Sequence, residues 1–84
     1  MSYTKIENFL YEIEHYLMEK YGCDAAYREL SPLKWYITTG RASAPFLHSL
    51  LESKPFVIAR LLHKGGSDDE VISRLKAKLN IESY

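Results

Sequence analysis

The sequence predicts an all-α fold, a compact bundle of about five short helices in a single domain that spans residues 1–84. One observation is the recurrence of apolar residues every three or four positions near the amino terminus, and another is the division of the remainder by Pro and Gly into short segments. The third is composition: 46% hydrophobic and 26% charged residues in 84 positions can close one core.

The first helix is expected to begin at Thr4, which has the capping-box spacing with Glu7, and to end at Gly22. Its main apolar face is formed by Ile6, Phe9, Leu10, Ile13, Tyr16, Leu17 and Tyr21. A second, narrower stripe of the same spacing consists of Tyr11, His15 and Met18. A helix that is apolar on two faces lies centrally in its domain or meets a partner.

The next segment is predicted as a short helix over 25–30, capped by Asp24 and interrupted at Ser31-Pro32, because the residue before a proline disfavours helical backbone. Residues 33–39 allow two interpretations. Pro32 and Gly40 favour a helix, whereas alternating β-branched and aromatic side chains favour a short strand over 34–39. A helix is preferred, because a strand needs a second strand to pair with. The only candidate for that second strand, 56–60, is itself predicted to be helical.

Two further helices are expected over 44–52 and 54–64, joined with almost no loop. Both follow a Ser-x-Pro-Phe segment, in which Ser43 and Ser53 would cap the helix and proline would occupy its first turn.

The last helix, 68–79, has the most complete local signals. Gly65-Gly66 breaks the chain before it, Ser67 and Glu70 have capping-box spacing, and Arg74, Lys76 and Lys78 suit its carboxyl end. Asn80 and Ile81 are expected to close it.

A cytoplasmic location is expected. Cys23 is the sole cysteine, so an intrachain disulfide is excluded, and the acidic first thirty residues do not resemble a signal peptide. No apolar run approaches the ~18 residues that a membrane-spanning helix needs, so no membrane association is expected.

The pattern of reactive residues predicts no enzyme, no metal, no cofactor and no small-molecule substrate. Gly65-Gly66 lacks the flanking residues of a phosphate-binding loop, and neither the three histidines nor Cys23 have zinc-site spacing. The glutamates of the first helix, spaced by seven residues, indicate solvated flanks of an apolar stripe.

Charge is unevenly distributed although the net charge is zero: residues 1–30 hold three basic and six acidic side chains, and residues 32–66 hold five basic and one acidic. A nucleic-acid-binding, helix-turn-helix-like regulator is therefore one hypothesis, with 54–64 as the reading helix. Its contacts would be Lys34, Arg41, Lys54, Arg60, His63 and Lys64.

The preferred hypothesis is a small regulatory or adaptor protein that binds a protein partner or itself. Aromatic residues are enriched at protein interfaces, and Tyr11 and Met18 stand off the main stripe of an acidic helix. The residues expected to make the contact are Tyr11, His15, Met18, Trp35 and Tyr36.

Overall fold

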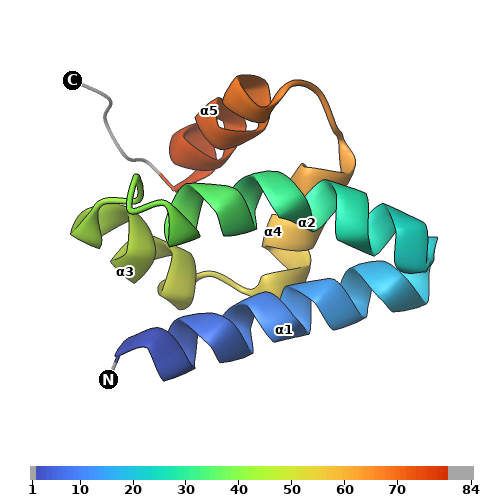
Figure 1. Cartoon of the computed structure of the whole chain (residues 1–84), viewed down its shortest axis with the longest axis horizontal. Helices are drawn as coiled ribbons and strands as arrows, with labels where there is room; N and C mark the ends of the chain where they lie inside the picture. The colour runs from blue at the N-terminus through green and yellow to red at the C-terminus, as the bar shows by residue number, and fades with distance from the viewer. Residues whose placement is uncertain (1, 80–84) are drawn as a thin grey trace.

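The computed structural model describes residues 2–79, with side chains from residue 5 onward, and within that range the chain contains helices and no strand. The elements are α1 (Ser2–Tyr21), α2 (Cys23–Thr38), α3 (Ala44–Glu52), α4 (Pro55–His63) and α5 (Asp68–Lys78) (Figure 1). The all-α prediction is confirmed, and the strand over 34–39 is excluded because these residues continue α2 to Thr38.

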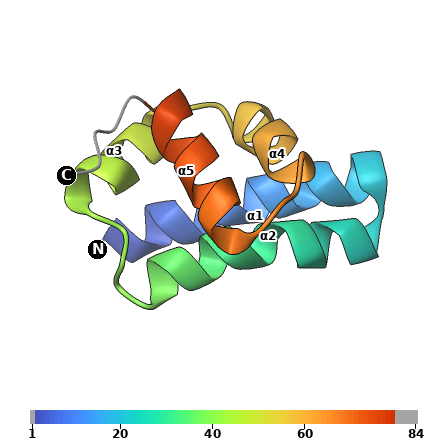
Figure 2. The ribbon, with the colours of Figure 1, turned by 90° about the horizontal axis from the view of Figure 1, so that it is seen from above.

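Helices α1 and α2 form an antiparallel pair that turns at a single residue, Gly22 (Figure 1). Gly22 has a φ of 99°, a backbone conformation that residues with a Cβ rarely adopt, so the chain can reverse there without a loop. The other helices pack on this pair: α4 contacts α1, α2 and α5, whereas α3 contacts mainly α1. Figure 1 shows α5 on the side of α2 that faces away from α1, and Figure 2 shows it running across the α1–α2 pair.

The core lies between α1, α2 and α4, and each of the five helices contributes to it. Its largest fully buried side chains are Phe46, Ile13, Leu17, Leu30, Leu33, Leu50, Ile58, Leu62 and Leu75. Five residues of the main stripe predicted for the first helix are buried and form the core-facing side of α1, whereas Tyr16 is half-buried and Tyr21 is 37% exposed. The second stripe is left on the outside.

The predicted interruption at Ser31-Pro32 is wrong, because α2 runs through both residues. A proline inside a helix costs about 3 kcal/mol. Leu30 and Leu33, on either side of it, are both fully buried, and each such burial contributes about 1.5–3 kcal/mol. Packing therefore outweighs the local penalty. The hydroxyl of Ser31 also donates a hydrogen bond to the Tyr27 carbonyl at 2.6 Å.

Three of the expected helix caps are corrected by the structure. Helix α1 begins at Ser2, so Thr4 has helical backbone and is not the cap. Gly22 stands at the start of α2, which places Asp24 in the first turn rather than at the cap. Ser53 ends α3, with its hydroxyl donating to the Ser49 carbonyl at 3.1 Å, and α4 starts after Lys54 with no side-chain cap.

The helix caps predicted at Ser43 and Ser67 are confirmed. The Ser43 hydroxyl accepts the Phe46 N–H at 3.2 Å. In α5, Ser67 and Glu70 form the reciprocal capping box, at 2.8 and 3.2 Å. The closing residues Asn80 and Ile81 lie outside the described range.

Candidate functional site

A groove of about 920 Å³ runs along the outer side of α1 and is closed on one side by the start of α4. It is lined by Asn8, Tyr11, Glu12, Glu14, His15, Tyr16, Met18, Glu19, Pro55 and Phe56. The second stripe of α1, predicted as a contact surface, therefore forms one wall of the groove.

The groove wall on α1 follows from helical spacing. Tyr11, His15 and Met18 are separated by four and three positions, so they project from one face of the helix. That face does not enter the core: Tyr11 is 73% exposed and Met18 is 41% exposed. The His15 imidazole lies 3.3 Å from the Glu19 carboxylate one turn later, at the rim.

The opposite wall comes from α4 and was not predicted. Phe56 is 41% exposed, and its ring centroid lies 6.4 Å from that of Tyr16, which belongs to the main stripe of α1. This aromatic pair forms the floor where the two helices meet. Phe56 and Phe46 occupy equivalent places in the two Ser-x-Pro-Phe segments, yet Phe46 is buried against Tyr36 at a centroid distance of 5.2 Å. Nothing in the local sequence indicates that Phe46 is buried and Phe56 is exposed.

The rim of the groove is acidic. Glu12, Glu14 and Glu19 line it, and its lining within residues 2–79 includes no Lys or Arg. The groove continues through Asn8 and Glu12 into a second hollow of about 440 Å³. That extension is lined by Lys5, Asn8, Phe9, Glu12, His48, Leu51 and Glu52. The hollowed surface thus follows α1 over most of its length.

Trp35 and Tyr36, which were grouped with the α1 stripe in the sequence, lie at a separate place. They line a smaller hollow of about 190 Å³ with residues of α5, and this hollow shares no residue with the α1 groove. Two cations already cover their rings: the Arg41 guanidinium lies 4.6 Å from the Trp35 ring centroid, and the Lys76 ammonium lies 5.5 Å from that of Tyr36. The structure therefore does not bring the five predicted partner-binding residues together.

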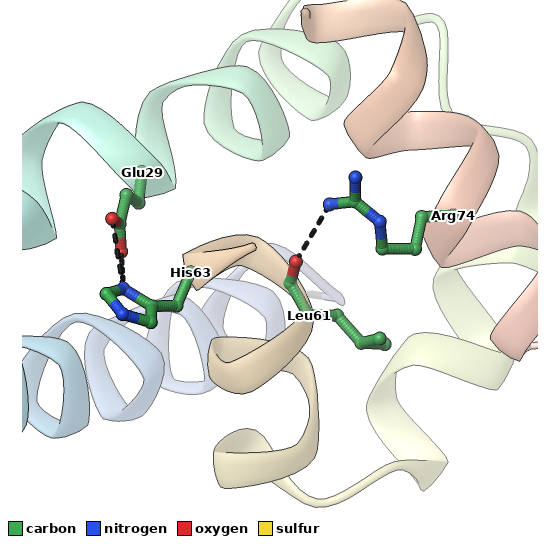
Figure 3. Close-up of polar contacts among 4 residues, drawn as sticks. All are labelled: Glu29, Leu61, His63 and Arg74. Atoms are coloured by element: carbon green, nitrogen blue, oxygen red, sulfur yellow. Dashed lines mark hydrogen bonds and ion pairs between the residues drawn. The ribbon is translucent and has the colours of Figure 1, made fainter. Parts of the chain in front are cut away.

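His63, one of the six basic residues assigned to nucleic-acid contact, has a side chain that is 43% exposed but is held by Glu29 of α2 (Figure 3). Its Nδ1 lies 3.0 and 3.1 Å from the two carboxylate oxygens of Glu29 on α2, whose side chain is only 12% exposed. Its ring stacks on Tyr21 of α1 at 3.6 Å between centroids. This cluster joins α1, α2 and α4, and the 34-residue separation of Glu29 and His63 puts it beyond any local sequence signal.

A second polar contact ties α5 to α4, as Figure 3 also shows. The Arg74 guanidinium donates to the Leu61 carbonyl at 3.1 Å. Leu61 lies in the last turn of α4, and its carbonyl also accepts the Lys64 N–H at 3.3 Å. Arg74 is therefore a second donor to this carbonyl, and it links α5 to the end of α4.

The other four predicted basic residues are exposed and are distributed over four elements or connections. Lys34 lies on α2, Lys54 lies between α3 and α4, Arg60 lies on α4, and Lys64 follows α4. On α4 the fully buried Ile58, Ala59 and Leu62 face the core. The exposed side of α4 therefore carries both Arg60 and Phe56.

Two features of the described residues bear on other classes of protein. No helix among them is long and apolar enough to cross a bilayer. In the same range, no three His, Cys, Asp or Glu side chains gather closely enough to hold a metal ion.

Comparison of the chain with protein-family models, with curated proteins and with solved structures found no match in any of the three.

Proposed function

We propose that this chain is a non-catalytic regulatory or adaptor module that docks a protein partner in the groove between α1 and α4. The observation that carries the proposal is the groove itself, in which Tyr11, Met18 and Phe56 stay exposed although the fold has closed its core elsewhere. Large apolar side chains that share one hollow on a small protein are typical of an interaction site.

The residue types support docking of a macromolecule. Tyrosine combines a large contact area with a polar group, and methionine adapts its shape to different partners at little cost. Tyr11 and Met18 supply both along α1, while the Tyr16–Phe56 pair provides a fixed floor. Apolar anchors surrounded by a polar, solvent-accessible rim are the usual arrangement of a protein interface.

The experiment is affinity capture from the native host with three forms of the chain: wild type, Tyr11→Ala/Phe56→Ala, and Tyr27→Ala. Tyr27 is 79% exposed on α2 and does not line the groove, so it is a matched control for loss of an exposed aromatic ring. Because all three side chains are exposed, the variants should fold, which circular dichroism checks.

The proposal predicts that a protein retained by the wild type and by Tyr27→Ala is lost from Tyr11→Ala/Phe56→Ala. Capture of the same proteins by all three forms would contradict a docking role for the groove.

Nucleic-acid binding is the second candidate, favoured by the exposed Lys34, Lys54, Arg60 and Lys64 in a segment with an excess of positive charge. It receives less support, because Arg41 and His63 from the same set are engaged with Trp35 and Glu29. Binding to random duplex DNA separates the two functions: affinity that falls steeply with salt supports this candidate, and absence of binding at low salt removes it.

A further inference from the structure

We infer that the occupant of the α1–α4 groove is a basic amphipathic helix of another protein, and not a second copy of this chain. This inference rests on the proposed docking function and specifies the chemistry of the partner.

Charge gives the first argument. Glu12, Glu14 and Glu19 surround the apolar anchors, and the groove lining from the described residues holds no Lys or Arg. The basic groups nearby are His15, which lies 3.3 Å from Glu19, and Lys5, which lines the adjoining hollow. A partner that carries Lys or Arg beside its apolar residues would be steered toward this rim and paired with it. A neutral or acidic segment would leave three carboxylates opposite uncharged or like-charged groups.

The same carboxylates disfavour a second copy. A two-fold dimer brings each surface patch against its own equivalent, so docking two such grooves would gather the three glutamates of both chains at one interface. Like charges brought together in this way oppose association.

Shape gives the second argument. The α1 residues that line the groove extend from Asn8 to Glu19, which is about 16 Å along a helix axis. Tyr11 and Met18 lie two turns apart, about 10 Å, which matches the spacing of anchors at positions i and i+7 of a docked helix. The described part of the chain offers no sheet edge to which an extended peptide could add as a strand.

The test measures fluorescence anisotropy of labelled probe peptides added to the full chain. The first probe is a designed helical peptide of about 16 residues, long enough to form a helix on docking, with Leu at i, i+3, i+4 and i+7 and Lys elsewhere. The second replaces each Lys by Glu. The third has the composition of the first in a scrambled order that removes the apolar face.

The inference predicts that only the first probe binds with appreciable affinity, and that its affinity falls between about 0.05 and 0.5 M salt. Glu12→Gln/Glu14→Gln/Glu19→Gln should weaken its binding by roughly tenfold, as expected for three partly screened charge pairs. A charge-matched control, Glu7→Gln/Asp24→Asn/Asp69→Asn, removes three carboxylates that do not line the groove and should change affinity less than twofold, about 0.4 kcal/mol or below.

Equal binding of the acidic or scrambled probe would overturn the inference, as would equal weakening by the control variant. Sedimentation of the wild type as a dimer that Tyr11→Ala/Phe56→Ala dissociates would also overturn it, in favour of a second copy. If capture from the host depends on the groove but the basic probe does not bind, the docking function stands and only the inferred partner chemistry falls.

Discussion

The carboxylate of Glu70 accepts the backbone N–H of Ser67 at 2.8 Å. This hydrogen bond, the further one from the Ser67 hydroxyl and the nearby charge of Arg74 hold the pKa of Glu70 below its ordinary value of 4.5, against a weaker opposing effect of burial. A folded-state pKa below the unfolded one means that the unfolded chain binds the proton more tightly. The contact therefore stabilises the fold at neutral pH and loses its effect as pH falls through the folded-state pKa.

We predict that Glu70→Gln is less stable than the wild type at pH 7 and that the difference shrinks as pH falls below 4.5, the ordinary pKa of this carboxyl. Glutamine keeps an acceptor for the Ser67 N–H but does not titrate, so the variant isolates the charge. Urea unfolding of both proteins at several values of pH measures the difference. A difference that is constant from neutral to acid pH would contradict the assignment.

His63 illustrates why residue type alone does not identify a residue that contacts nucleic acid. In the sequence it stands among lysines and arginine, where a role at phosphate is reasonable. In the structure its ring is stacked on Tyr21 and its Nδ1 faces both oxygens of Glu29. The partners come from two other helices, so only the tertiary fold reveals them.

At the scale of the elements, the two Ser-x-Pro-Phe segments provide an internal comparison. Ser43 caps α3 with its side chain, whereas Ser53 belongs to the end of α3 and α4 starts without a side-chain cap. The difference follows from the short connection: with only two residues between α3 and α4, Ser53 still bonds back to Ser49.

Ser43→Ala should therefore lower the free energy of unfolding by about 1 kcal/mol, the usual cost of removing a capping hydroxyl. Ser53→Ala should cost less, because its hydroxyl donates to the Ser49 carbonyl at the end of α3 and caps no free N–H of α4. The backbone N–H of residue 53 would still donate to the Leu50 carbonyl in the variant. Thermal unfolding of the two variants checks the order. A larger loss at Ser53 would mean that it contributes more to the α3–α4 connection than its observed contacts indicate.

The elements that could be predicted from the sequence are those with local causes. Helix α5 follows from its capping box and charges, and α1 follows from its apolar repeat. The continuity of α2 could not be predicted, because Pro32 is a local signal for a break while the burial of Leu30 and Leu33 that overrides it is tertiary.

The candidate site shows the same division. The wall formed by Tyr11, His15 and Met18 follows from periodicity, since a second stripe on an already amphipathic helix has no place in the core. The wall formed by Phe56 depends on where α4 meets α1, which no local pattern encodes. Trp35 was expected to belong to the site, but it lies beside α5 in a separate hollow. Its position also depends on how the helices pack, which no local pattern encodes.

At the scale of the whole molecule, the fold separates two tasks along its longest helix. The inner side of α1 closes the core with α2 and α4, and the outer side remains available as an acidic, aromatic groove. The core takes apolar residues from all five helices, so exposing the groove does not require the domain to leave its core open.

The central claim, that the groove is the docking surface, is tested most directly by two-dimensional ¹H–¹⁵N NMR of the labelled full chain titrated with the basic helical probe. We predict that the largest changes in amide chemical shift fall on Tyr11, Met18 and Phe56 and their neighbours along the groove, while Trp35 and α5 change little. Changes centred on Trp35, or on Arg60 and Lys64, would contradict the claim, whereas an unchanged spectrum would contradict only the inferred chemistry of the partner.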